Sequence, residues 1–370
     1  MDESPSRRRA REFGLTFGQL PPGPLNAITD VAGVLVGHCT VSWGEPDLPT
    51  GKGPARTGVT AVLPHGGDLF HERVVAGAHV ASGAGELIGI TSIREWGLIE
   101  TPVMLTNSQS IGAVYDATVR WIMARDQRVG IEDVAMPVIG ECDDSLLNDM
   151  RGMHVLPEHA QAALDSAASG PVPEGCVGAG TGVVCFDFKG GIGTSSRRVK
   201  TAGSGYTVGV LAQTNFGCRH RLTLGGLPVG REIPDLMPEE PGGLGAHREG
   251  SCVVVVATDA PLTARGCTRL AARASFGLAA MGSIAADASG EIMLAFSTAT
   301  RLPRATTCPD QIVAVANDAM DPLFAGAIEA TTEAVANALC AAETTSGRGG
   351  TLVHALPHDR LEQLVRRGRI

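Results

Sequence analysis

Three features are scarce in this sequence: aromatic residues, long apolar runs and regularly spaced cysteines. Aromatic residues make up 4% of the 370 residues, so the core must be built mainly from Ala, Val, Leu and Ile. No apolar run approaches the roughly 18 residues that a membrane-spanning helix needs. The first residues carry positive charge, but no apolar stretch follows them, which disfavours a secretory signal. We therefore expect a cytoplasmic protein with no membrane partner.

The nine cysteines are scattered along the chain, odd in number and without a C-x-x-C pair. This distribution disfavours a disulfide scaffold or a structural zinc site and favours reduced thiols. The formal net charge is −9, so a nucleic-acid partner is not expected either. Arg7, Arg8, Arg9 and Arg11 form a local basic cluster, which we interpret as a solvated start of the chain.

Glycine is abundant, with 48 residues, and 44% of the chain is hydrophobic against 19% charged. This is enough apolar material for a large core, which excludes global disorder. Many glycines among small side chains predict backbones that approach one another closely. Expected helices and strands interleave, which predicts a mixed α and β fold. The expected helices cover residues 111–124, 158–168, 267–281 and 321–343, the strands residues 34–36, 57–63, 103–105, 134–139, 183–188, 207–214, 252–257 and 291–297, and a loop residues 231–250.

Several common catalytic motifs are incomplete. The glycines of residues 178–182 suggest nucleotide binding. However, Lys189 is preceded by Phe188 and followed by Gly190, so the phosphate-loop pattern G-x-x-x-x-G-K-[ST] is not met. His71 begins an H-E-x-x-H pattern that fails at Val75. His65 and His71 are therefore expected on a surface loop, and no serine lies in a G-x-S-x-G elbow. We expect no cofactor and no metal.

The junction between the expected loop and the buried strand CVVVVA is a Gly250–Ser251 bond. A serine hydroxyl can attack the preceding carbonyl and form an ester, which water then cleaves; glycine obstructs this attack least. Cleavage would leave Ser251 with a free α-amine, whose pKa of about 7.7–8.0 suits a base near neutral pH. The dipeptide alone is also compatible with a serine that merely begins a strand.

The surroundings of Ser251 resemble peptidase family S58, the DmpA-type L-aminopeptidase/D-esterase and β-peptidyl aminopeptidase group. The resemblance covers most of the chain, and its blocks follow in the family's order. They are PGPLNAITDVAGVLVGH, TGVTAVLPHGG, TNSQSIGAVYDA, GAGTGVVCFDFKGGIGTSSR, VGREIPDL, GSCVVVVATDAPL, SGEIMLAFST and VHALPHDRL.

The resemblance implies a single αββα domain whose precursor cleaves itself into an α chain (residues 1–250) and a β chain (residues 251–370). It implies Ser251 as the nucleophile at the new N-terminus and Asn215 as an oxyanion-hole donor. Ser289 and Glu291 match the S-x-E pair of the family. Because residues two apart on a strand face the same side, both could reach Ser251. The resemblance also implies a homotetramer.

Glu141 matches an acidic position that binds the α-ammonium of the substrate in relatives. This sequence departs from the family at Asp143, where many relatives carry an aromatic residue. Glu141, Asp143 and Asp144 are thus expected near the rim of the pocket, which leaves substrate preference open. Asn148 and Asp149 are interpreted as a structural turn.

We therefore expect a serine aminopeptidase that acts on small peptides, amides or esters with a free amino terminus. One alternative is an acyltransferase in the style of ornithine acetyltransferase, although that group uses a threonine nucleophile. Another is an unprocessed binding protein on the same scaffold.

Overall fold

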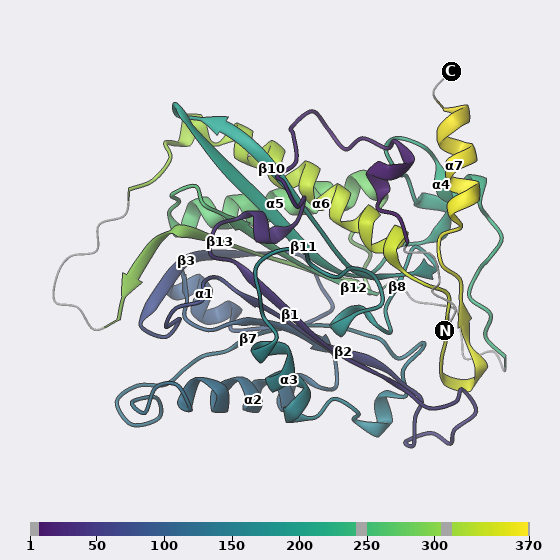
Figure 1. Ribbon diagram of the computed structural model, residues 1–370, viewed down its shortest axis with the longest axis horizontal. Helices are drawn as coiled ribbons and strands as arrows, with labels where there is room; N and C mark the ends of the chain where they lie inside the picture. Colours follow the sequence, from purple (N-terminus) through teal and green to yellow (C-terminus); the bar gives the residue numbers. More distant parts are fainter. Residues whose placement is uncertain (1–6, 242–249, 305–312, 369–370) are drawn as a thin grey trace.

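The computed structural model describes residues 7–241, 250–304 and 313–368. Its chain forms four layers, in which two stacked β-sheets are covered by helices on both outer faces (Figure 1). This is the predicted αββα sandwich. Figure 1 shows α5 and α6 on one side of the layered sheets, and α2 and α3 on the other side. The bounds of these helices are α5 (Ala264–Met281), α6 (Asp321–Ala341), α2 (Ile111–Met123) and α3 (Pro157–Asp165).

The six-stranded sheet has the strand order β10-β11-β12-β13-β3-β5. β12 runs antiparallel to β11 and parallel to β13. As a result, the first residue of β12 lies between the last residue of β11 and the first residue of β13. The strands are β10 (Gly191–Thr201), β11 (Ser204–Asn215), β12 (Ser251–Thr258), β13 (Gly290–Pro303), β3 (Glu72–Gly83) and β5 (Leu98–Ile99).

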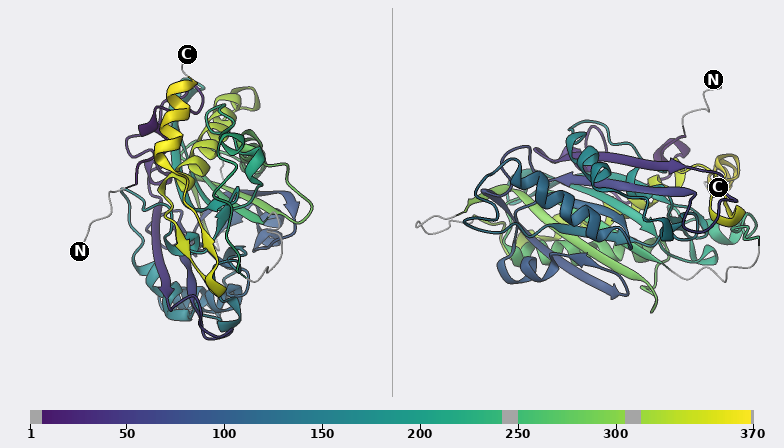
Figure 2. Two further views of the ribbon diagram at one scale, coloured as in Figure 1. Left: turned by 90° about the vertical axis from the view of Figure 1, so that its right-hand side faces the viewer. Right: turned by 90° about the horizontal axis from the view of Figure 1, so that it is seen from below.

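The five-stranded sheet has the order β1-β2-β6-β7-β4, with β6 and β7 parallel and the other pairs antiparallel. Seen from below in Figure 2, α2 and α3 lie in front of this sheet. Its strands are β1 (Leu35–Trp43), β2 (Ala55–Leu63), β6 (Val103–Asn107), β7 (Val138–Cys142) and β4 (Leu87–Ile88). Two small hairpins are β8 (Val184–Cys185) with β9 (Phe188–Lys189), and β14 (Thr345–Ser346) with β15 (Leu352–Val353).

Shorter helices complete the described part of the chain, and none of the described helices is long and apolar enough to cross a membrane. They are α1 (Ile90–Trp96), α4 (Val229–Glu232), α7 (His358–Arg367) and the 3-10 turns Ala10–Phe13, Ile28–Asp30, Met150–Gly152, Gly178–Gly180, Arg219–Arg221, Asn317–Ala319 and Arg348–Gly350.

β12 is buried on both faces, as its continuous apolar composition predicts. Val253 and Val255 pack into the core between the two sheets, whereas Cys252 and Val254 pack against the helices α5 and α6. Because side chains alternate along a strand, Ser251 falls on the face of Val253. The side chain of Ser251 is thus directed between the sheets.

Glycines let the helices lie close to the six-stranded sheet. A Cβ atom on Gly77 of β3 would lie 2.3 Å from the backbone nitrogen of Thr268 in α5, and one on Gly193 of β10 would lie 1.9 Å from the carbonyl oxygen of Ala334 in α6. The close approach inferred from composition is thus found here. The small side chains that allow this close approach give no strand signal in the sequence, which explains why β3 and β10 were not predicted.

Three predicted segments need correction. Residues 183–188 form no single strand, because Phe186 and Asp187 both have positive φ and turn the chain between β8 and β9. The strand expected over residues 134–139 begins at Val138 and ends at Cys142. The loop expected over residues 231–250 begins with the end of α4, and its residues 242–249 lie outside the described part.

The helix predictions and the strands over residues 57–63, 103–105, 207–214 and 252–257 are confirmed within a few residues at their ends. The strands expected over residues 34–36 and 291–297 are longer than predicted and extend to Trp43 and Pro303. The helix expected over residues 321–343 ends at Ala341, two residues early. These segments share strong periodicity or continuous apolar composition, which local sequence reveals.

Candidate active site

Ser251 begins β12 and is 4% exposed. Its Oγ has no hydrogen-bond partner among the described residues. A buried hydroxyl without a partner loses its hydration without compensation, and such groups are uncommon in folded proteins. An unpaired hydroxyl beside a chain junction is therefore a candidate nucleophile.

Asn215 is the last residue of β11 and pairs with Ser251 across the sheet. The backbone N–H of Val184 donates to Oδ1 of Asn215 at 2.9 Å, which directs Nδ2 the other way. A Cβ atom on Gly250 would lie 2.4 Å from that Nδ2. The amide donor of Asn215 thus lies against the Gly250–Ser251 junction, where it could donate to an oxyanion formed there.

A buried lysine fixes the loop that orients Asn215. Lys189 is fully buried and donates from Nζ to the carbonyl oxygens of Gly180, Val183 and Gly190 at 2.9–3.0 Å. Because Val183 precedes the donor to Asn215, Lys189 positions that donor. Lys189 is thus a positioning residue, not a phosphate ligand.

Gly290, the first residue of β13, supplies a second donor at the junction. Its N–H donates to the carbonyl oxygen of Gly250 at 3.2 Å, and its Cα lies opposite Ser251 in the parallel register. A backbone donor of this kind has no signature in the sequence, because any residue carries an N–H. Only the register of β12 and β13 reveals it.

Ser289 and Glu291 lie together, as their spacing suggested. Ser289 Oγ donates to Oε1 of Glu291 at 3.4 Å, and Ser283 Oγ donates to the same oxygen at 2.5 Å. Glu291 lies opposite Cys252, one residue beyond Ser251, and neither serine bonds Oγ of Ser251. Ser283 follows α5 in a turn and was not predicted, because an isolated serine there carries no sequence signal.

Glu141 lies near the end of β7 and is 6% exposed. The backbone N–H of Glu86 donates to its Oε1 at 2.9 Å, and Ser108 Oγ donates to its Oε2. Burial raises the pKa of Glu141, although these two hydrogen bonds oppose the rise. Charges on Asp143 and Glu86 raise the pKa further. A buried carboxylate in this setting is stabilised by an incoming cation.

Two glycines lie between Glu141 and Ser251. A Cβ atom on Gly85 would lie 3.2 Å from Oε1 of Glu141 and 3.0 Å from the Cα of Gly290. Gly290 is in turn the neighbour of Ser251. Gly85 and Gly290 thus form a side-chain-free strip from the carboxylate of Glu141 to Ser251, and side chains at these two positions would fill it.

Asp144 is not at the rim, contrary to expectation. It is fully buried, accepts a hydrogen bond from Nδ2 of Asn148 at 2.8 Å, and burial raises its pKa to about 7. Asp149 accepts the N–H groups of Gly51 and Gly53, so its role is structural, as predicted. Of the three acids expected at the rim, Asp143 alone is exposed.

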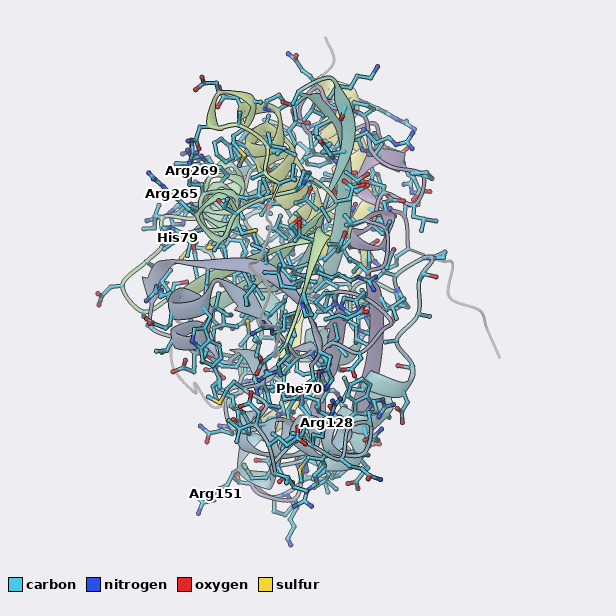
Figure 3. All side chains as sticks on the ribbon, turned by 90° about the vertical axis from the view of Figure 1, so that its left-hand side faces the viewer. Phe70, His79, Arg128, Arg151, Arg265 and Arg269 are labelled. Atoms are coloured by element: carbon cyan, nitrogen blue, oxygen red, sulfur yellow. The ribbon has the colours of Figure 1, made fainter. Side chains whose placement is uncertain are left out.

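A second cluster of ionisable groups lies at the end of the molecule where Figure 3 shows Phe70 and Arg128. Asp68, His71 and Asp126 hold possible metal ligands within 4.8 Å of one another. However, Arg128 Nε donates to Asp126 at 3.0 Å, and hydrogen bonds from Arg128 lower the pKa of Asp126. The guanidinium of Arg128 thus occupies the carboxylate oxygens of Asp126 that a metal ion would need. Both histidines lie in the loop between β2 and β3, as expected; His71 is half-buried there, whereas His65 is buried and not at the surface.

Comparison with protein families matches residues 26–353 to the model of peptidase family S58. Beta-peptidyl aminopeptidase BapA of Sphingosinicella microcystinivorans is 43% identical over 379 aligned positions, which cover 98% of this chain and 92% of that protein. The relative of the same name from Sphingosinicella xenopeptidilytica is 41% identical, with 97% and 91% covered.

Solved structures agree in fold over nearly the whole chain. A beta-aminopeptidase of Burkholderia sp. superimposes with a TM-score of 0.89 at 43% identity, with 97% of this chain and 99% of that chain covered. The L-aminopeptidase D-Ala-esterase/amidase of Ochrobactrum anthropi superimposes with a TM-score of 0.90 at 41% identity, with 98% and 99% covered. That structure is described as a prototype of the serine aminopeptidases and a variant of the Ntn hydrolase fold.

Proposed function

This chain belongs to peptidase family S58 and is a serine aminopeptidase with the fold of the N-terminal-nucleophile hydrolases; from that premise we propose that Ser251 is its nucleophile, released by cleavage of the Gly250–Ser251 bond. The observation that carries the proposal is the unpaired, buried hydroxyl of Ser251 beside a carbonyl bonded by the Gly290 N–H. The α chain is then residues 1–250 and the β chain residues 251–370 of one domain.

Self-cleavage begins when Oγ of Ser251 attacks the carbonyl carbon of Gly250. The Gly290 N–H and Nδ2 of Asn215 stabilise the negative charge that develops on the carbonyl oxygen. The C–N bond breaks, the nitrogen takes the proton from the hydroxyl, and an ester remains. Water hydrolyses that ester to a carboxylate on Gly250 and the free hydroxyl of Ser251, whose α-amine was released when the C–N bond broke.

The free amine then serves as the base for peptide hydrolysis. It accepts the proton of the Ser251 hydroxyl as that oxygen attacks the substrate carbonyl and passes the proton to the departing amine, which leaves an ester on Ser251. The same amine then takes a proton from the water that attacks this ester and returns it to Oγ, so that the acid departs and the hydroxyl of Ser251 is restored. Once the bond to Gly250 is broken, Ser251 is free to turn toward Glu291, which would stabilise the ammonium form. Ser283 and Ser289 hold Glu291 in place.

Glu141 selects the substrate by its amino terminus. The α-ammonium binds the carboxylate, the first residue lies along the strip of Gly85 and Gly290, and its carbonyl reaches Ser251. Since only a free amine is positively charged, blocked peptides lose this interaction. We propose short peptides, amides or esters as substrates, in line with the names of the relatives.

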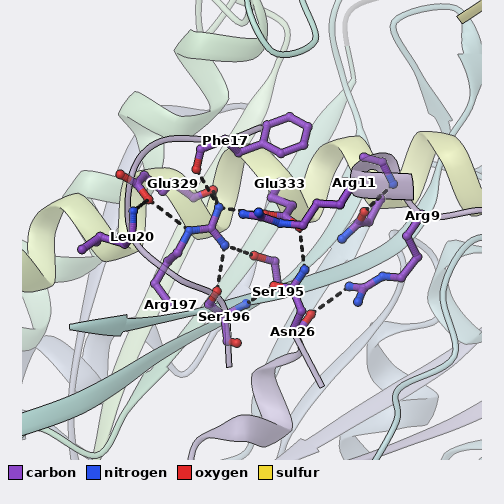
Figure 4. A network of polar contacts seen from close by, with 12 residues as sticks. Arg9, Arg11, Phe17, Leu20, Asn26, Ser195, Ser196, Arg197, Glu329 and Glu333 are labelled. Atoms are coloured by element: carbon purple, nitrogen blue, oxygen red, sulfur yellow. Dashed lines mark hydrogen bonds and ion pairs between the residues drawn. The ribbon is translucent and has the colours of Figure 1, made fainter. Parts of the chain in front are cut away.

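Buried ion pairs would hold the two chains together after cleavage. Arg197 of the α chain contacts Glu333 of the β chain at 2.8 Å, and Arg11 contacts the same carboxylate at 2.7 Å (Figure 4). The basic cluster at the start of the chain is therefore not simply solvated: Arg9 also contacts Glu174 at 2.7 Å. Pairing of β12 with β11 and of β13 with β3 joins the chains as well.

We further propose a homotetramer of αβ units in the cytoplasm. Large apolar side chains such as Trp96, Phe276 and Ile284 are exposed on the described surface, and subunit contacts would cover them. No disulfide joins any two of the eight described cysteines, which suits a reducing compartment. Sedimentation at micromolar concentration would measure the assembly.

Substitution of the nucleophile tests the function. Ser251→Ala is expected to remain one chain of 38.2 kDa and to lose turnover of amino-acid p-nitroanilides, whereas the unaltered protein gives a β chain with the N-terminal sequence Ser-Cys-Val-Val. Intact mass and N-terminal sequencing measure the cleavage. If the alanine variant still splits at this bond, the intramolecular mechanism is wrong. If the unaltered chain stays intact and inactive, the binding-protein alternative is favoured.

A further inference from the structure

Two exposed carboxylates flank the buried carboxylate of Glu141. The backbone N–H of Glu86 donates to Glu141 at 2.9 Å, so the exposed side chain of Glu86 begins next to the site. Asp143 follows Glu141 by two residues and is exposed, and the N–H of Ser145 donates to its Oδ1 at 2.8 Å. The carboxylate of Asp143 is thus held by a backbone N–H, and the side chain of Glu86 leaves the backbone beside Glu141.

No cation balances this group of carboxylates. Among residues 7–241, 250–304 and 313–368, neither Glu86, Glu141 nor Asp143 takes part in an ion pair. The charged neighbours that act most strongly on Glu141 are Asp143 and Glu86, both negative. One substrate ammonium would neutralise Glu141 but leave two negative charges beside it.

We propose that this site selects an N-terminal residue with a cationic side chain, such as lysine or ornithine. The inference rests on the proposed function, in which Glu141 binds the α-ammonium and Ser251 attacks the carbonyl. Asp143 and Glu86 then attract the second cation. They are specificity-determining residues, not catalytic ones, because they act on a side chain away from the reacting bond.

The position of the substrate side chain follows from the strip of Gly85 and Gly290. The first residue must span from Glu141 to Ser251, so its backbone lies along the strip. Its side chain leaves from a carbon between the ammonium and the carbonyl, and therefore starts close to Glu141. A flexible chain that ends in an ammonium can reach Asp143 or Glu86, whereas a neutral chain gains nothing there and an acidic chain is repelled.

A matched pair of substrates tests the inference. Lysine p-nitroanilide and norleucine p-nitroanilide share a four-carbon side chain and differ in the terminal ammonium. For the processed enzyme we expect kcat/KM to favour lysine by about 3- to 5-fold at low salt, as expected for exposed charge pairs. The ratio should fall toward one in about 1 M NaCl, where charges are screened beyond roughly 3 Å.

Charge-neutral variants locate the preference. Glu86→Gln combined with Asp143→Asn should bring the ratio of lysine to norleucine within about 2-fold. Glu132→Gln is the matched control, because Glu132 is also exposed but lies in the turn before β7, at the opposite end of that strand from Glu141. The control should keep the ratio of the unaltered enzyme.

Three outcomes are decisive. A ratio of one or less in the unaltered enzyme, with norleucine hydrolysed, overturns the inference and leaves the proposed function standing. A ratio that the double variant retains overturns it as well, because another group then recognises the cation. Failure of the processed enzyme to hydrolyse any free-amine amide overturns the proposed function itself.

Discussion

Arg197 on β10 and Ser251 on β12 are both buried in the six-stranded sheet, but they differ in hydrogen bonding. Arg197 is fully buried and donates to Ser195, to three backbone carbonyls and to Glu329 and Glu333 (Figure 4). Ser251 leaves its hydroxyl unpaired. Under the proposed function, the polar groups around Arg197 hold the two chains together, whereas the hydroxyl of Ser251 stays unpaired for reaction.

The two clusters also differ in how their carboxylates ionise. Burial would raise the pKa of Glu333, but the hydrogen bond from Arg11 and the charges of Arg197 and Arg11 outweigh it and lower that pKa. Burial raises the pKa of Glu141, and its neighbouring charges are negative. Ionised Glu333 therefore stabilises the fold, whereas ionised Glu141 costs stability that a bound ammonium would restore.

The largest effect is expected at Arg197. Arg197→Met should lower the free energy of unfolding by about 3–5 kcal/mol, because Glu329 and Glu333 lose a buried charged partner. Thermal unfolding and dissociation of the processed chains measure this loss. The kcat of the molecules that remain folded should stay near that of the unaltered enzyme.

Arg198→Met is the matched control for that change, because Arg198 is the next residue along β10 and is exposed. It should change stability by less than about 0.5 kcal/mol. Equal stability of the two variants would refute the assignment of the Arg197 cluster to chain association. A lower kcat without loss of stability would remove the distinction between the two clusters.

The next largest effect is expected at Asn215. Asn215→Ala should lower kcat and kcat/KM together by about 10²–10³, the usual cost of one oxyanion-hole donor. Asn215→Asp keeps an oxygen for the Val184 N–H but has no N–H of its own, so it should lose at least as much. Both variants must be assayed on chains confirmed as processed, since self-cleavage passes through a similar oxyanion.

The stability of the two Asn215 variants provides a second test. Neither Asn215 variant should lower the free energy of unfolding as far as Arg197→Met does. Near-normal turnover by processed Asn215→Asp would contradict the assignment, and the Gly290 N–H would then be the donor to examine.

The sequence predicted β12 well, because the continuous apolar run CVVVVA, rich in β-branched valine, is typical of a buried strand. The fold class and the proposed roles of Glu141 and Asn215 followed from the family resemblance, since periodicity alone favours a turn at QTNFG. The Gly290 N–H, Ser283 and Ser108 could not be predicted, because strand register and tertiary contacts place them. Asp144 was misplaced at the rim because adjacent acids in a sequence do not reveal which of them is buried.

The smallest effect is expected at Glu141, where KM should also change with pH in a defined direction. The pKa of Glu141 lies above the ordinary carboxyl value of 4.5, so the carboxylate is lost earlier on acidification than in an exposed glutamate. The KM of the processed enzyme should therefore rise as the pH falls from 8 toward the raised pKa of Glu141. Glu141→Gln should raise KM by about 10- to 100-fold at neutral pH, the worth of a charged hydrogen bond, with a smaller change in kcat.

The glutamine variant should also lack the Glu141 contribution to the pH dependence of KM. Because a raised carboxyl pKa makes the ionised group unfavourable in the fold, Glu141→Gln should be at least as stable as the unaltered protein at neutral pH. That difference should fade as the pH falls and Glu141 becomes protonated. Arg197→Met destabilises at the same pH, so the two substitutions should move unfolding in opposite directions. If Glu141→Gln instead lowers stability at neutral pH and leaves KM unchanged, Glu141 belongs with the structural cluster, and the ammonium must bind elsewhere.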